Sequence, residues 1–130
     1  MIVPDGAKKD GSGFDAVCDN LNVICDIADE YGVTVTVEDF DSADVIISNT
    51  DSIKRAFEKV PKLRHTFDTG NYAYFNESAT EAYKVFKDRI VHVHLKDRAF
   101  SPVEDGYPTT FADGTLAYPC AIGDGCIEIE

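Results

Sequence analysis

Two hydrophobic periods alternate along the chain. Apolar side chains recur every three or four positions over residues 14–31, which predicts an amphipathic helix that Gly32 ends. The same period predicts shorter helices over 51–60 and 78–88. Strict alternation of apolar and polar residues predicts strands between these helices.

The predicted strands cover residues 33–39, 63–68 and 90–96, and residues 1–4 resemble the end of another strand. Each of the three complete strands has one apolar and one polar face. We expect the apolar set to be buried against helices, and this set is Val33, Val35, Val37, Val91, Val93 and Leu95. We expect the polar set to face the other way, and this set is Thr34, Thr36, His92 and Lys96. His65 has the parity of the apolar face, so we interpret it as a structural residue on the helix side.

The order of strand, helix and strand predicts an α/β fold built from parallel β-α units with right-handed crossovers. Parallel strands covered by helices on both faces are usually apolar throughout, whereas these strands carry a polar face. In a barrel the polar face points inward, toward a site at the mouth. The pattern therefore favours part of a (β/α)8 TIM barrel.

Composition narrows the classes of partner. The formal net charge is −12, which makes nucleic acid and anionic membranes poor partners. No apolar run approaches the roughly 20 residues of a membrane span, and the start of the chain does not resemble a signal peptide.

Cys18 and Cys25 lie on the apolar stripe of the first helix, where we expect buried thiols. Cys120 and Cys126 could be metal or redox ligands, and a reducing cytoplasm is the simplest location.

Three polar residues occupy matching positions at the ends of successive strands. Glu38 and Asp68 are 30 residues apart, Asp68 and His94 are 26 apart, and each has the inward parity of its strand. Adjacent parallel strands would bring two carboxylates and an imidazole together at the mouth. This set of ligands suits Mn, Mg, Co or Zn. His92 shares the parity of His94 but lies one layer deeper.

Four segments carry a family resemblance: "VTVTVED", "HTFDTGN", "HVHLKD" and "GDGCIEI". In this order and spacing they resemble the xylose isomerase-like TIM-barrel superfamily. That group includes sugar-phosphate isomerases and epimerases, ketose 3-epimerases, inosose dehydratases and, more distantly, endonuclease IV. The resemblance covers nearly the whole chain.

The resemblance implies roles for individual residues. Glu38, Asp68 and His94 match the family's metal ligands, and Glu38 also matches the base that moves a proton in the ketose epimerases. A divalent ion held by two substrate oxygens would stabilise an enediolate. The histidine of the family's D-x-G-H motif is Asn71 here, which can hydrogen-bond a hydroxyl but is a poor acid or base. The candidates for substrate contact are Asn71, His92, Lys96, Asp97 and Arg98.

The length of the chain limits the expected barrel. A full barrel needs roughly 250 residues, so residues 1–130 form a single partial TIM-barrel domain, about half a barrel, from about strand four to the start of the last helix before the final strand. The family's last metal ligand, a glutamate, would then lie beyond Glu130. We expect the segment 98–122 to lie over the mouth or to form a surface excursion. Open sheet edges predict self-association.

The leading hypothesis is a fragment of a divalent-metal-dependent sugar isomerase or epimerase that acts on a polyhydroxy carbonyl substrate. The alternatives are an inosose or keto-sugar dehydratase with the same metal chemistry, and a non-catalytic half-barrel that binds a sugar or a partner chain. We expect the 130-residue chain on its own to be inactive.

Overall fold

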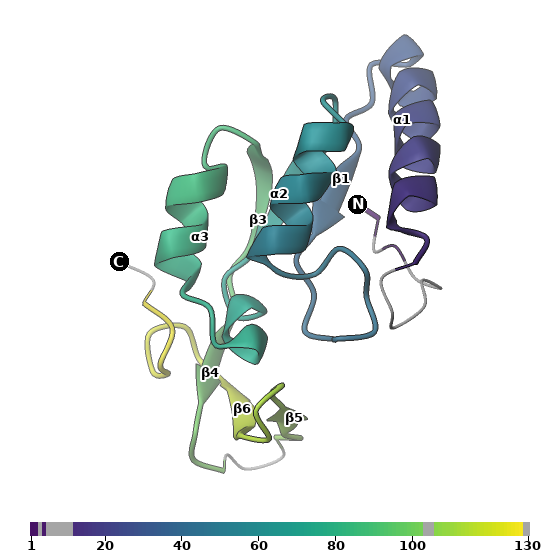
Figure 1. Cartoon of the computed structure of the whole chain (residues 1–130). Coiled ribbons are helices and arrows are strands. Elements are labelled where there is room, and N and C mark those ends of the chain that lie inside the picture. The colour runs from purple at the N-terminus through teal and green to yellow at the C-terminus, as the bar shows by residue number, and fades with distance from the viewer. Residues whose placement is uncertain (3, 5–11, 103–105, 129–130) are drawn as a thin grey trace.

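The computed structural model describes residues 1–2, 4, 12–102 and 106–128. Helices alternate with parallel strands, and a small antiparallel sheet follows the last parallel strand (Figure 1). The elements in chain order are α1 (Phe14–Glu30), β1 (Thr36–Glu38), α2 (Thr50–Lys59), β2 (Arg64–Asp68), the 3-10 helix η1 (Tyr72–Phe75), α3 (Ala79–Phe86), β3 (Ile90–His94), β4 (Asp97–Ala99), β5 (Thr109–Thr110) and β6 (Leu116–Cys120). None of the described helices is long and apolar enough to cross a membrane.

Strands β1, β2 and β3 form a parallel sheet in that order. Ile2 makes one parallel bridge with Val37, on the far side of β1, and its N–H donates to the carbonyl of Thr36 at 2.8 Å. The start of the chain therefore lies where a fourth parallel strand would lie. The parallel α/β order predicted from the hydrophobic pattern is confirmed.

The core forms where the apolar stripes of the helices meet one face of the sheet. On β1 and β2 the prediction from alternation is confirmed, because the apolar side chains are buried and the polar ones lie on the opposite face. There Thr36 and Thr66 share a hydrogen bond of 2.8 Å between their hydroxyls. Cys18 and Cys25 are buried free thiols, as expected. The core residues include Phe14, Cys18, Leu21, Cys25, Val35, Val37, Ile53, Ala56, Phe57, Leu63, Phe67, Ala79, Ala82 and Phe86.

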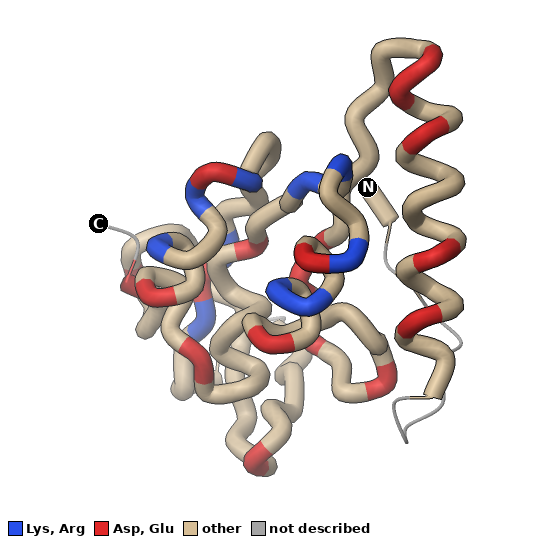
Figure 2. Tube along the Cα trace, turned by 45° about the horizontal axis from the view of Figure 1, so that its top comes forward, with Lys and Arg blue, Asp and Glu red and all other residues tan. Residues whose placement is uncertain are grey.

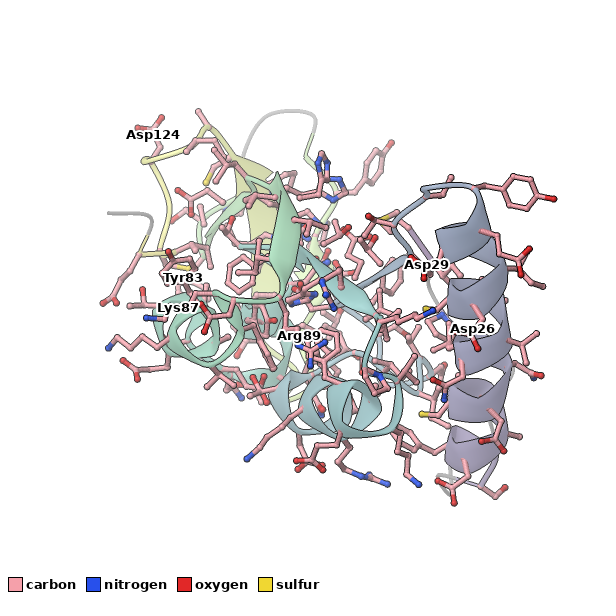
Figure 3. The ribbon with its side chains drawn as sticks, turned by 90° about the horizontal axis from the view of Figure 1, so that it is seen from above. Asp26, Asp29, Tyr83, Lys87, Arg89 and Asp124 are labelled. Carbon is pink, nitrogen blue, oxygen red and sulfur yellow. The ribbon has the colours of Figure 1, made fainter. Side chains whose placement is uncertain are left out.

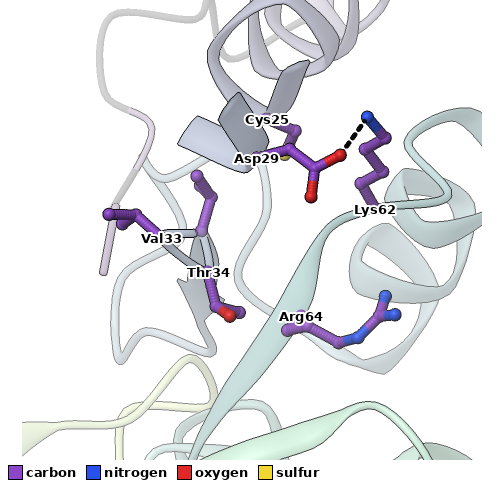
Figure 4. Close-up of a pocket in the computed structure, with 7 residues that line it drawn as sticks. Cys25, Asp29, Val33, Thr34, Lys62 and Arg64 are labelled. Carbon is purple, nitrogen blue, oxygen red and sulfur yellow. Dashed lines mark hydrogen bonds and ion pairs between the residues drawn. The ribbon is translucent and has the colours of Figure 1, made fainter. Parts of the chain in front are cut away.

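The first helix contacts the sheet through its buried stripe and through ion pairs at its carboxyl end. Acidic side chains occur along α1 without a basic one (Figure 2), and Asp26 and Asp29 project from the side that faces the rest of the molecule (Figure 3). Lys62, in the loop before β2, binds both carboxylates, at 2.9 Å and 2.8 Å. Asp29 and Lys62 border a hollow of about 150 Å³ that Cys25 and Arg64 also line (Figure 4). The partners are half exposed, so these pairs orient α1 more than they stabilise it.

The segment after β3 forms the antiparallel sheet β4-β6-β5 beyond the carboxyl ends of β1–β3 (Figure 1). This sheet contacts η1 through Phe111, whose ring centroid lies 6.3 Å from that of Tyr74. The N–H of Ala112 also donates to the carbonyl of Tyr74 at 2.9 Å. The described residues of the expected excursion, 98–102 and 106–122, thus form an extension on the same side as the strand ends.

His65 lies at the centre of an aromatic cluster on the helix side of β2, as its parity predicts. Its ring is fully buried between Phe57, Phe67 and Phe86, with ring centroids 5.3 to 5.9 Å away. Its Nδ1 bonds to the carbonyl of Val37 at 3.0 Å. Burial lowers the pKa of His65 to about 4, so the ring is neutral in the folded protein at neutral pH.

The buried neutral ring predicts a loss of stability in acid. In the unfolded chain the imidazole of His65 becomes protonated below a pKa of about 6.5, whereas in the folded protein it stays neutral down to about pH 4. The difference in the free energy of unfolding between wild type and His65→Gln should therefore become less favourable to wild type as the pH falls. The change is up to about 1.4 kcal/mol per pH unit between pH 6.5 and pH 4. Urea unfolding of both proteins at several pH values measures this difference. Asp39, 3.7 Å from the ring, is present in both proteins, so its own titration largely cancels; a difference independent of pH would contradict the prediction.

The expected burial is wrong for four apolar residues. Val33 is 59% exposed, and on β3 Val91, Val93 and Leu95 are 55%, 46% and 60% exposed. Val33 precedes the first residue of β1, so it has no strand partner that would hold it under a helix. On β3, α3 covers only the side nearer β2, and a hollow of about 290 Å³ remains between Tyr83 of α3 and the side chains of Val93 and Leu95. Alternation correctly places Val93 and Leu95 on the side of α3, because both line this hollow with Tyr83, but no other described helix covers them.

The self-association expected from the sequence stays a prediction. Val93 and Leu95 at one end of the sheet, and Val23 and Ile27 on the outer side of α1, are about half exposed. Replacing both Val93 and Leu95 by serine should weaken association about tenfold or more, because burying each apolar side chain contributes about 1.5–3 kcal/mol. Sedimentation velocity over a concentration series measures the effect. Tyr107→Ser, at a 90% exposed position outside the parallel sheet, is the control; a chain that remains monomeric throughout would refute the expectation.

Candidate metal site

The candidate site lies at the carboxyl ends of the three parallel strands. Glu38, Asp68 and His94 are the last residues of β1, β2 and β3. The Nδ1 atom of His94 lies 2.6 Å from Oε1 of Glu38 and 4.0 Å from Oδ2 of Asp68. One ligand atom of each residue lies within 4.8 Å of the others. The structure therefore brings together the three residues that the sequence singles out.

A shift of register between β2 and β3 gives His94 its place. His65 pairs with Ile90, but the next residue, Thr66, pairs with His92, so β3 advances two residues while β2 advances one. Such a bulge reverses the face on which the following residues point. Ile90 consequently packs on the core, while His94 stands opposite Asp68 on the inner face.

The three side chains fit a divalent ion in chemistry and in spacing. Two carboxylates and one imidazole are a mixed oxygen and nitrogen donor set, as Mn, Mg, Co and Zn accept. Two ligands of one ion, each about 2.1 Å from it, stand roughly 3 to 3.5 Å apart, so small rotations of Glu38 and His94 would admit one. Glu38 and Asp68 are 5% and 1% exposed, whereas the His94 side chain is 39% exposed. Solvent and substrate can thus reach the site from the β3 side.

Lys96 and Asn71 border the ligand set. The ammonium group of Lys96 lies 2.9 Å from Oδ2 of Asp68 and donates to Oδ1 of Asn71 at 2.7 Å. Gly70 makes room for the lysine stem, because a Cβ at this position would lie 2.9 Å from its Cγ. The cation offsets part of the negative charge of the two carboxylates. Lys96 is the accessible one of the two, with its side chain 35% exposed, whereas Asn71 is 1% exposed and both ends of its amide are already hydrogen-bonded, to Lys96 and to the carbonyl of Asp39.

The other predicted contact residues lie in three different settings. His92 is exposed on the inner face, with its ring centroid 5.0 Å from that of His94. Arg98 is nearly buried and pairs with Asp41 at 3.0 Å. Asp97 is 1% exposed, and within the described part of the chain its carboxylate accepts hydrogen bonds from the backbone N–H groups of Arg98, Gly123, Gly125 and Ile127 at 2.8 to 3.1 Å.

These contacts give Asp97 a structural function. Burial alone would raise its pKa, but the backbone hydrogen bonds outweigh burial and lower it. A Cβ at position 125 would lie 2.2 Å from Oδ1 of Asp97, so the loop around this carboxylate needs Gly125.

Sequence reasoning missed Asp39. It follows Glu38 with the opposite parity and is fully buried. Its Oδ1 accepts the N–H of Asp68 at 2.8 Å, and its carbonyl accepts Nδ2 of Asn71 at 2.8 Å. Burial, with the neighbouring carboxylates Asp68 and Glu38 as further causes, raises the pKa of Asp39 to about 8. At neutral pH it is therefore protonated, and its contact with the neutral ring of His65 at 3.7 Å is not an ion pair.

A sequence model of one protein family matches almost the whole chain. The family is described as "Xylose isomerase-like TIM barrel", and the match covers residues 2–130. An inosose dehydratase from Bacillus velezensis is 28% identical over an alignment of 130 positions, which covers 88% of this chain and 40% of that protein. The chain thus spans about 40% of the length of this curated relative.

Two solved structures share the fold. A xylose isomerase domain protein from Planctomyces limnophilus superposes with a TM-score of 0.67 at 19% identity, over 97% of this chain and 40% of the other. A 3-keto-D-glucoside 4-epimerase from E. coli gives a TM-score of 0.60 at 19% identity, over 78% of this chain and 41% of the other. The parallel sheet with helices on one face is therefore part of a TIM barrel, and the chain belongs to the xylose isomerase-like TIM-barrel family.

Proposed function

We propose that Glu38, Asp68 and His94 hold one divalent metal ion and that a polyhydroxy ketone reacts beside it. The observation that carries the proposal is the convergence of these three side chains at one rim, with their ligand atoms within 4.8 Å of one another. An ion such as Mn, Mg, Co or Zn would supply a Lewis acid that polarises the substrate carbonyl. The substrate is a sugar or a cyclitol, because the neighbouring groups are hydrogen-bonding side chains.

In this proposal Glu38 moves the proton. A carboxylate that removes the proton from the carbon beside a carbonyl acts as a general base, and Glu38 is a carboxylate held at the inner end of β1. Lys96 orients the substrate by binding its hydroxyl groups, and the buried Asn71 holds Lys96 in place through a hydrogen bond of 2.7 Å. Asp97 takes no part, because its carboxylate is committed to the loop of residues 123–127.

Loss of water is the first candidate for the overall reaction. Removing a proton beside the carbonyl and a hydroxyl from the next carbon requires a base and an acid on the same substrate. Lys96 is a cation 2.9 Å from Asp68, so it can donate a proton to the departing hydroxyl. The relative from Bacillus velezensis, named inosose dehydratase, supports this choice.

Epimerisation is the second candidate, and His92 favours it. Inverting a carbon centre requires removal of a proton on one face and its return on the other. Glu38 and His92 project from β1 and β3, two strands apart across the inner face, so they can serve opposite faces of a substrate. The E. coli protein named 3-keto-D-glucoside 4-epimerase supports epimerisation only in that it shares the fold of this chain.

Metal binding tests the site directly. Calorimetric titration with Mn²⁺ should show one ion per chain, and Glu38→Gln or Asp68→Asn should each weaken binding at least tenfold, because removing even an indirect partner of a metal ligand commonly weakens binding 10- to 100-fold. Glu81→Gln, which removes an exposed acid on α3, is the control for loose binding to an acidic surface. Equal affinity in all four proteins would show that the ions bind to the surface and not at the rim.

Proton exchange tests the chemistry independently of the final product. In D₂O with Mn²⁺, NMR of a longer barrel that contains this chain should show exchange at the carbon beside the carbonyl of an inosose or a 3-keto-glucoside, and Glu38→Gln in that barrel should slow it about 100-fold or more. Appearance of an enone absorbance then identifies dehydration, while a new sugar isomer identifies epimerisation. Metal binding without exchange, in this chain and in a longer barrel that contains it, would favour a sugar-binding domain without turnover.

A further inference from the structure

We propose that Asp39 is a positioning residue that fixes the geometry of the metal-binding rim through the backbone of Asp68 and the side chain of Asn71. This inference rests on the function proposed above for Glu38, Asp68 and His94. Asp39 itself points to the helix side of the sheet and is fully buried, so it is placed to act through its neighbours and not on a substrate.

The first step is the way in which Asp39 extends the pairing of β1 and β2. The regular register between these strands ends with Glu38 opposite Thr66. Beyond that point the Asp39 side chain supplies the next hydrogen bond between the two strands, because its Oδ1 accepts the N–H of Asp68 at 2.8 Å. The carbonyl of Asp39 holds the loop after β2 through Nδ2 of Asn71 at 2.8 Å. One residue therefore ties the end of β1 to two residues of the rim.

These bonds belong to a closed ring. The side chain of Asp39 holds Asp68, the carboxylate of Asp68 binds Lys96 at 2.9 Å, and Lys96 donates to Asn71 at 2.7 Å. The side chain of Asn71 returns to the carbonyl of Asp39 at 2.8 Å. The ring connects the carboxyl end of β1, the end of β2 with its following loop, and Lys96, the second residue after β3. A substitution of Asp39 that removes its acceptor breaks this ring and releases the N–H of Asp68. It does not change the side chain of any proposed metal ligand.

The environment of Asp39 holds it in one orientation. The ring of His65 lies 3.7 Å from Oδ1 and is itself fixed by bonds to the carbonyl of Val37 and the hydroxyl of Tyr72, at 3.0 Å and 2.8 Å. Among the described residues, Oδ2 of Asp39 has no hydrogen-bond partner. The acceptor Oδ1 is therefore the atom on which the positioning depends, and an amide oxygen in its place would serve equally well.

The test compares variants that differ in this acceptor. Asp39→Asn keeps an oxygen at Oδ1, whereas Asp39→Ala removes it. We expect Asp39→Ala to bind Mn²⁺ at least tenfold more weakly than wild type, and Asp39→Asn to bind within about threefold of it. Hydrogen exchange at the Asp68 amide, followed by NMR without metal, should be about tenfold faster in Asp39→Ala and nearly unchanged in Asp39→Asn.

Leu63→Ala is the matched control. Leu63 is fully buried just before the opposite end of β2, so its truncation lowers stability without touching the rim. We expect it to leave the affinity of the folded protein and the local exchange of the Asp68 amide unchanged. Equal loss of affinity in Leu63→Ala and Asp39→Ala would reduce Asp39 to a general stabilising residue and overturn the proposal.

The remaining outcomes separate this inference from the function on which it rests. If wild type binds no Mn²⁺, the proposed metal site fails, and the exchange rate of the Asp68 amide alone decides whether Asp39 positions that residue. An unchanged exchange rate of the Asp68 amide in Asp39→Ala would refute the inference. A loss of Mn²⁺ affinity in Asp39→Asn as large as that in Asp39→Ala would refute it as well. Should Asp39→Ala not fold, Asp39→Glu replaces it, since the added methylene displaces the acceptor; normal affinity and normal exchange in that variant would also refute the proposal.

Discussion

The register of a parallel sheet is the constraint on which the site depends. Parallel strands present their carboxyl ends at the same edge, and residues opposite each other point to the same face. Asp68 stands opposite His94, and Glu38 ends the strand beside them. The shift between His65 and Thr66 is part of this constraint, because without it His94 would have the parity of the core. A change of one residue in the pairing of β3 would thus remove a ligand without altering the sequence.

Gathering acids at one edge has an electrostatic consequence. Glu38, Asp39 and Asp68 lie together in a chain of net charge −12, and burial strengthens repulsion between ionised groups. The structure reduces the repulsion in two ways: Asp39, with its pKa raised to about 8, is neutral at neutral pH, and Lys96 pairs with Asp68. The two remaining carboxylates, beside an imidazole, attract a divalent cation.

The strands and the three converging residues could be predicted from the sequence because both depend on local periodicity. Alternation of period two assigns each side chain to a face, and a strand end marks the rim. Alternation does not reveal whether a helix covers a face, so Val93 and Leu95 were expected to be buried and are about half exposed. It also does not identify a distant partner. The function of Asp97 depends on a loop 26 residues or more away, and that of Asp39 on a backbone N–H 29 residues away.

The candidate metal ligands and the core share strand β2, so that metal binding at this rim would be linked to folding. On one face β2 presents Asp68 to the rim, and on the other it presents His65 and Phe67 to the aromatic cluster of Phe57 and Phe86. An ion that binds only the folded sheet adds a stabilisation of about RT ln(1 + [ion]/Kd) to the protein. Conversely, loosening the cluster behind β2 would let Asp68 move and would weaken the binding of such an ion. Because the two effects act through the same five-residue strand, the packing behind the sheet and the chemistry in front of it constrain each other.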